Sequence, residues 1–130
     1  MFLDTSGLVA YLDASAASHA DAETFFHAAP SRLTHSYVLA EFVALCQARK
    51  LGRELTLSFV TDLLENPEIE MIWVDELLIR TALEFLKIRL DKGYSLCDAV
   101  SFLIMQERTL TEALTTDHHF EQAGFRRLLS

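Results

Sequence analysis

The chain has 130 residues, of which 51% are hydrophobic, and a mean hydropathy of +0.20. This length favours a single domain, residues 1–130, and four Gly and two Pro leave no segment with the composition of a linker or a repeat. The formal net charge of −8 argues against a protein that binds nucleic acid by neutralising phosphates over a broad surface, but not against an enzyme that meets phosphate through metal ions.

Short strands alternate with helices along the chain. The expected elements are strand 1–4, helix 8–12, helix 16–29, strand 31–34, helix 37–46, helix 55–64, strand 70–74, helix 75–92, helix 95–105, strand 113–116 and a short closing segment around 125–129. This alternation predicts an α/β fold in which helices cover both faces of a central, mostly parallel sheet of four or five short strands.

Two details of these elements can be checked in a structure. Ser36 is expected to cap the helix over 37–46. The helix over 75–92 is amphipathic and is expected to continue to Gly93, with Leu90 among its inward-facing residues.

Cys46 and Cys97 both lie in apolar helical runs, without the CxxC or Cys/His spacing of a zinc site. We expect them to be small core residues, which fits a reducing compartment. The sequence starts without a basic segment followed by an apolar one and has no apolar run of 18 residues. We therefore expect a cytoplasmic protein with no membrane span.

Basic residues occur in three small groups, at 49–53, 87–92 and 126–127. Two interpretations remain open. They are charges near helix C-termini that suit the helix dipole, or they form a rim that contacts phosphate.

Asp4 and Asp117 each lie at the carboxyl end of a predicted strand. Ligands of open α/β sheets bind at the carboxyl ends of the strands, so both positions are candidates for a functional site. The structural alternative for Asp4 is that it caps the helix that follows.

Asp98 is the only charged residue between Lys92 and Glu107, in a helix that is apolar almost all the way round. A carboxylate taken out of water needs a cation, several hydrogen-bond donors or a raised pKa. Its own helix offers no Lys or Arg. The structural alternative is a capping box, because Ser95 and Asp98 fit the Ser-x-x-Asp pattern.

Glu41 is likewise the only charged residue between Arg32 and Arg49. Its neighbours three and four positions away are apolar, where a surface Glu would have polar ones, so we expect it within an apolar stripe. A capped or extended surface Glu is the alternative.

If the fold brings these four acids together, they repel one another, by roughly 4 kcal/mol for one pair at about 4 Å and an effective dielectric constant near 20. A divalent cation removes this repulsion, and an all-carboxylate site favours Mg²⁺ or Mn²⁺ over zinc. Such a site suits phosphodiester hydrolysis, in which a metal acidifies the attacking water and stabilises the leaving oxygen.

The pattern resembles the PIN-domain nucleases, and most closely the VapC toxins of toxin–antitoxin pairs. The resemblance covers the whole chain through four short motifs whose order and spacing are more specific than any one of them: Leu3-Asp4-Thr5-Ser6, the Thr34 to Glu41 segment, Ser95-Leu96-Cys97-Asp98-Ala99, and Leu114 to Phe120.

This resemblance implies a PIN-like three-layer α/β/α domain with a Mg²⁺- or Mn²⁺-dependent endoribonuclease activity. It makes Asp4, Glu41, Asp98 and Asp117 the metal-binding acids, with Asp4 and Asp98 the direct ligands. Thr5, Ser6 and Thr116 match polar positions that support the acids. It also implies an RNA substrate, a VapB-like antitoxin partner and a homodimer.

The adjacent His118 and His119 are not a defining feature of the family. We expect them to lie in a solvated turn, and a contact with phosphate is the alternative.

Other function classes fit less well. A haloacid dehalogenase-type phosphatase also begins with a strand and an Asp, but it needs a second Asp where this chain has Ser6. A P-loop enzyme needs a Gly-rich run that ends in Lys-Ser or Lys-Thr, which is absent. The remaining non-enzymatic alternative is a catalytically silent PIN-like module that binds a protein partner.

Overall fold

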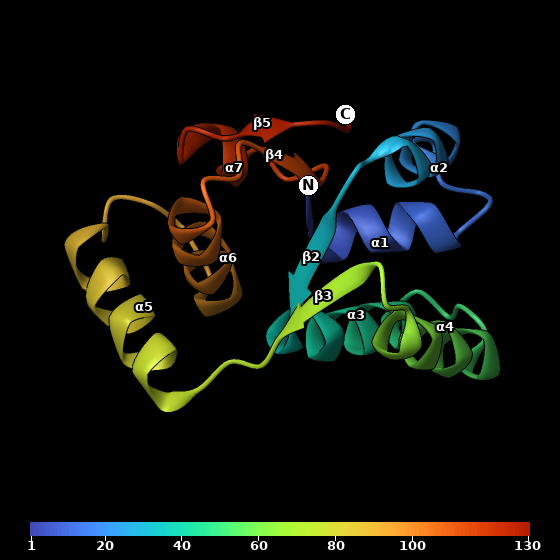
Figure 1. The fold of residues 1–130 in the computed structure, drawn as a ribbon, viewed down its shortest axis with the longest axis horizontal. Coiled ribbons are helices and arrows are strands. Elements are labelled where there is room, and N and C mark those ends of the chain that lie inside the picture. The colour runs from blue at the N-terminus through green and yellow to red at the C-terminus, as the bar shows by residue number, and fades with distance from the viewer.

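The computed structural model describes all 130 residues and contains one sheet of five parallel strands in the order β3-β2-β1-β4-β5 (Figure 1). The strands are β1 (Phe2–Leu3), β2 (Arg32–His35), β3 (Ile69–Ile72), β4 (Glu112–Leu114) and β5 (Arg126–Arg127). The helices are α1 (Thr5–Leu12), α2 (His19–Ala28), α3 (Ser36–Ala48), α4 (Arg53–Glu65), α5 (Glu76–Ile88), α6 (Leu96–Glu107) and α7 (His119–Gln122). Because all strands are parallel, their carboxyl ends meet at one edge of the sheet.

Helices cover both faces of the sheet. Figure 1 shows α5 and α6 on one side and α1 to α4 on the other, and α5 packs against α6 while α1 packs against α2 and α3. This double cover explains why the central strands β1 and β4 carry the fully buried apolar residues Phe2, Leu3, Ala113 and Leu114. The predicted three-layer α/β/α fold with a parallel sheet is confirmed. No helix has the length and apolarity that crossing a membrane requires.

Some predicted element ends are wrong. The helix expected to reach residue 92 ends at Ile88, and Leu90 is 86% exposed instead of facing the core. Arg89 occupies the C-cap position and its guanidinium donates to the Asp91 carboxylate at 3.3 Å. The helical spacing of apolar residues in the sequence therefore extends beyond the last residue of the helix.

The cap of α3 is His35, not Ser36 as predicted. The Val38 N–H donates to His35 Nδ1 at 3.4 Å, whereas Ser36 Oγ accepts a hydrogen bond from the Val74 N–H at 2.9 Å. Ser36 thus connects α3 to the segment after β3, and the preceding residue caps the helix.

His35 also joins α3 to α6. Because its Nδ1 accepts, its Nε2 carries the proton and donates to Ser101 Oγ at 2.8 Å, and Ser101 Oγ donates to the Cys97 carbonyl at 2.9 Å. Burial lowers the pKa of His35 to about 4, so the imidazole is neutral near pH 7. This hydrogen-bond chain fixes the two helices that carry Glu41 and Asp98.

Gly7 lets α1 lie against β4. A Cβ at this position would be 1.9 Å from the Leu114 carbonyl oxygen, a backbone atom that cannot swing away. We expect Gly7→Ala to lower the free energy of unfolding by at least about 2 kcal/mol, measured by urea denaturation. Gly93→Ala is the control, because a Cβ there meets nothing within 4 Å. Equal unfolding midpoints for the two variants would contradict this close packing.

Candidate metal centre

An open depression of about 300 Å³ lies at the carboxyl end of the sheet, and all four lone acids line it. Its lining residues are Asp4, Thr5, Ser6, Glu41, Leu45, Gly93, Ser95, Asp98, Asp117 and His119. No Lys or Arg lines the depression or forms an ion pair with any of the four acids. The fold thus gathers carboxylates from four separate segments of the chain, with no Lys or Arg to neutralise them.

Asp4 is buried at the end of β1. Its Oδ2 accepts hydrogen bonds from Thr115 Oγ1 at 2.7 Å and from Ser6 Oγ at 3.3 Å. It occupies the N-cap position of α1, but its side chain forms no capping hydrogen bond. Burial, together with the charges of Asp98 and Glu41, raises the pKa of Asp4 to about 7 despite the Thr115 hydrogen bond. The capping alternative for Asp4 is therefore wrong.

Asp98 forms the capping box that was the structural alternative, and it also lines the depression. The capping box is present: the Ser95 N–H donates to Asp98 Oδ2 and the Asp98 N–H donates to Ser95 Oγ, both at 3.0 Å. Burial and the charge of Asp117 raise the pKa of Asp98, although the Ser95 hydrogen bond and His119 oppose the shift. The capping box therefore holds a carboxylate with a raised pKa in the depression.

Glu41 lines the same depression but is exposed, so the expectation that it lies within a buried stripe is wrong. Leu45, one turn later on α3, also lines the depression, which shows that this side of the helix faces an opening and not the core.

Cys97 is a buried free thiol, as expected, and burial with the nearby charges of Glu41 and Asp4 raises its pKa. A thiol that stays protonated is a core residue and a poor metal ligand.

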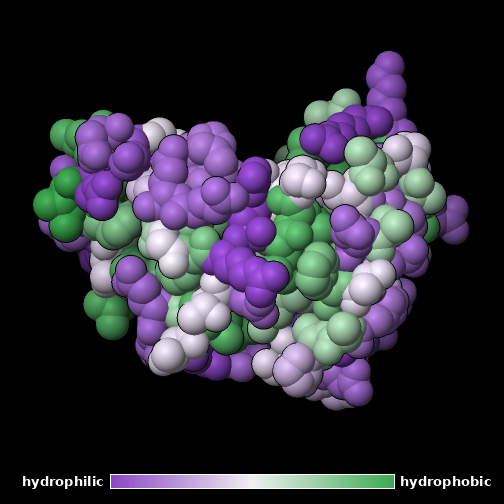
Figure 2. All heavy atoms as spheres, turned by 90° about the horizontal axis from the view of Figure 1, so that it is seen from above, coloured by the Kyte–Doolittle hydropathy of each residue, from purple (hydrophilic) through white to green (hydrophobic).

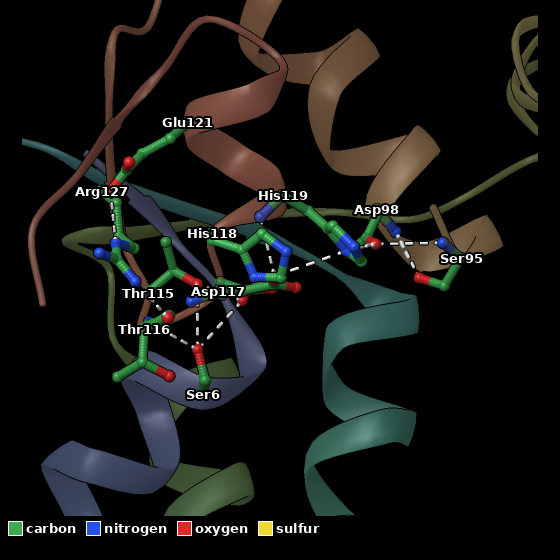
Figure 3. A network of polar contacts seen from close by, with 11 residues as sticks. Ser6, Ser95, Asp98, Thr115, Thr116, Asp117, His118, His119, Glu121 and Arg127 are labelled. Carbon is green, nitrogen blue, oxygen red and sulfur yellow. Dashed lines mark hydrogen bonds and ion pairs between the residues drawn. The ribbon is translucent and has the colours of Figure 1, made fainter. Parts of the chain in front are cut away.

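Two hydroxyl groups order the loop that carries Asp117 (Figure 3). Thr115 Oγ1 accepts from the Asp117 N–H at 3.0 Å, and Ser6 Oγ accepts from the Thr116 N–H at 3.0 Å. Thr116, predicted as a supporting residue, contributes only its backbone, and the supporting hydroxyl is that of Thr115. The strand register contains the missed signal, because Leu3 pairs with Leu114 and the next residues, Asp4 and Thr115, leave the sheet side by side.

His119 also belongs to the depression, which contradicts the expectation of a solvated histidine. Its side chain is 24% exposed, and its Nδ1 lies 3.2 Å from Asp98 Oδ2. By contrast, the His118 side chain is 65% exposed. Sequence patterns alone gave both histidines the same environment, and the turn after Asp117 separates them.

Comparison with known proteins identifies the family. A family model for the PIN domain matches residues 1–126. The chain belongs to the PIN-domain family.

Among curated proteins, none matches the sequence of this PIN domain. Among solved structures it is similar to VapC20 of Mycobacterium tuberculosis, described as a sarcin–ricin loop cleaving toxin. The TM-score is 0.90 and the sequences are 27% identical, with 99% of this chain and 98% of that chain covered. The predicted resemblance to VapC-like PIN domains is confirmed over the whole chain.

The residues of this PIN domain fit a hard divalent cation. Thr5 Oγ1 is buried without a hydrogen-bond partner, although Thr5 lines the depression. A cation and its bound water would give this orphaned hydroxyl a partner and would neutralise the carboxylates beside it. Carboxylate and hydroxyl oxygens are the ligands that Mg²⁺ and Mn²⁺ prefer.

Proposed function

We propose that this PIN domain is a divalent-metal-dependent endoribonuclease that acts as the toxin of a toxin–antitoxin pair. The observation that carries the proposal is the gathering of four carboxylates in one open depression with no Lys or Arg among them. We propose Asp4, Glu41, Asp98 and Asp117 as the acids that hold Mg²⁺ or Mn²⁺, with Asp4 and Asp98 as the direct ligands. A bound ion of this kind neutralises substrate phosphate and acidifies water.

The chain's own residues hold the acids in place. The Thr115 and Ser6 hydroxyls fix the Asp4 carboxylate, and the capping box fixes Asp98, so neither has to reorganise when an ion binds. Glu41 is exposed at the rim, where solvent and a substrate strand reach it first. Buried, fixed acids beside an exposed one suit a site that must hold an ion firmly and admit a polymer.

A second depression next to the first supports a proposed binding path for the RNA strand. It has a volume of about 150 Å³, is lined by Arg49 and Thr116 among others, and shares Ser6 with the first. Arg49 forms no ion pair and is exposed. We propose that a phosphate next to the scissile one contacts this arginine. Of the two interpretations of the basic residues, contact with phosphate then applies to the group at 49–53.

Partners and location follow from the same proposal. VapC20 is a toxin, and we propose that this chain likewise has an RNA substrate and a VapB-like antitoxin in the cytoplasm. We also propose a homodimer, because α5 and its flanks expose the apolar residues Trp73, Leu77, Ile88 and Leu90. Figure 2 shows apolar side chains at the edge of the molecule where Figure 1 places α5.

The direct test of this proposal uses the purified chain, free of bound partner, and single-stranded RNA labelled at one end. We expect Mn²⁺ to stimulate cleavage at least about 100-fold over an EDTA-treated sample, because the acids repel phosphate without an ion. Titration calorimetry should show Mn²⁺ binding. A chain that neither binds Mn²⁺ nor cleaves any RNA would instead support the silent protein-binding module.

A further inference from the structure

His119 brings a nitrogen atom into a depression that otherwise offers oxygen ligands. Its Nδ1 lies 3.2 Å from Asp98 Oδ2 and 3.5 Å from Asp117 Oδ1. One ligand atom from each of these three residues lies within 4.8 Å of the other two. Figure 3 shows the imidazole between the two carboxylates, which come from α6 and from the loop after β4.

A hydrogen bond between His119 Nδ1 and Asp98 Oδ2, at 3.2 Å, accounts for one of these two contacts but not for the approach to Asp117. The single N–H of Nδ1 points one way in the ring plane and cannot align with both oxygens. Each oxygen also has another donor, because Asp98 Oδ2 accepts from the Ser95 N–H and Asp117 Oδ1 accepts from the His119 N–H at 2.9 Å. The imidazole proton thus serves one carboxylate oxygen, and the second oxygen approaches the same nitrogen to 3.5 Å without being its hydrogen-bond partner, which brings three possible ligand atoms together.

The spacing of these atoms suits a shared cation. In an octahedral shell with metal–ligand distances of about 2.1 Å, adjacent ligand atoms lie roughly 3 Å apart. The two distances from His119 Nδ1 are close to this value and need only small adjustments. The buried, unpartnered Thr5 hydroxyl of the same depression is an independent sign of an additional polar ligand.

The imidazole is held in this position. The Tyr94 ring meets it edge to face at a centroid distance of 5.4 Å, and the Asp117 carboxylate accepts the His119 backbone N–H. The turn that follows β4 and the start of α7 thus present Nδ1 to the acids. A side chain held in advance loses little conformational entropy when it binds an ion.

We propose that His119 Nδ1 is a metal ligand together with Asp98 and Asp117, and that this nitrogen makes the centre prefer Mn²⁺ to Mg²⁺. The inference rests on the metal centre of the proposed function and changes its all-oxygen donor set to a mixed one. Imidazole suits transition metals, whereas Mg²⁺ keeps to oxygen ligands. The expectation that no His takes part in the site, on which the equal choice of Mg²⁺ or Mn²⁺ depended, is thereby revised.

Pulsed electron paramagnetic resonance of the Mn²⁺-loaded chain, prepared without a histidine tag, tests this directly. We expect modulation from an imidazole ¹⁴N nucleus in the wild type and in His118→Gln, and its loss in His119→Gln. Calorimetry with each metal alone should show Mn²⁺ affinity reduced about tenfold in His119→Gln, with Mg²⁺ affinity changed less than about twofold. His118→Gln is the matched control, because that side chain is adjacent but exposed.

The outcomes separate this inference from the proposed function. Mn²⁺ that binds the wild type without ¹⁴N modulation, or modulation that persists in His119→Gln, would overturn the ligand assignment and leave metal-dependent cleavage standing. Absence of any Mn²⁺ binding to the wild type would overturn both. A wild-type spectrum without ¹⁴N modulation overturns the assignment even if His119→Gln folds poorly, and modulation that persists in His118→Gln excludes the adjacent histidine as its source.

Discussion

Asp98→Asn is expected to lower the rate of Mn²⁺-dependent RNA cleavage by at least about 10³-fold while leaving the fold intact. The carboxylate lies at the centre of the depression, next to Asp4 and Asp117, so the substitution removes a proposed direct ligand. The asparagine carbonyl can still accept the Ser95 N–H, so the capping box that starts α6 is kept. The measurement is single-turnover cleavage of labelled RNA, with circular dichroism to verify the fold.

Asp62→Asn serves as the matched control, because it removes the same charge from an exposed position on α4, away from the acids. Cleavage by this control should stay within about twofold of wild type. Toxicity on expression gives a second readout: wild type and the control should stop growth, and Asp98→Asn should not. An Asp98→Asn protein that cleaves at the wild-type rate would remove this residue from the centre.

The four acids could be identified from the sequence because strand ends and isolated charges in apolar helices are easy to recognise. Asp4 and Asp117 follow strands whose carboxyl ends meet, and Asp98 is a charge that an apolar helix does not explain. Burial was harder to predict, since Glu41 has apolar neighbours along α3 yet faces an opening made by other elements. Helical spacing reports on one helix, whereas exposure depends on what packs against it.

His119 and Thr115 were missed for a related reason. Both act through the irregular segment after β4, whose geometry is set by hydrogen bonds to Asp117 and Ser6 and not by any periodic pattern. The strand register would have placed Thr115 beside Asp4. Nothing comparable distinguishes His119 from His118 before the turn is known.

Asp4→Asn is expected to stabilise the metal-free protein at pH 8 by up to about 4 kcal/mol, reduced by whatever the amide N–H groups lose without acceptors. The pKa of Asp4 rises from 3.8 in the unfolded chain to about 7 in the folded one. Its contribution to stability is complete below pH 3.8, is lost as the pH rises toward 7, and stays lost above that value. Asparagine has no charge to bury, so the variant escapes this loss.

Urea denaturation of both proteins in EDTA at pH 5 and pH 8 measures the effect, and comparison with the variant is essential. His35 acts in the opposite direction, because its folded pKa of about 4 lies below the unfolded value of 6.5, so its contribution increases as pH rises between those values. The two trends oppose each other in the wild type between pH 5 and 6.5. The change in the free energy of unfolding between pH 5 and pH 8 is therefore compared between wild type and Asp4→Asn. The difference between the two changes isolates Asp4, since His35 is common to both proteins.

Adding Mn²⁺ should narrow the stability difference between Asp4→Asn and the wild type. An ion that binds only the folded wild type at 100 times its Kd stabilises it by about 2.7 kcal/mol, and it should leave Asp4→Asn nearly unchanged. Asp62→Asn should follow the wild type in both conditions. A variant that is no more stable than wild type in EDTA at pH 8 would mean that the buried carboxylate is already neutralised within the protein, and the need for a cation at this position would disappear.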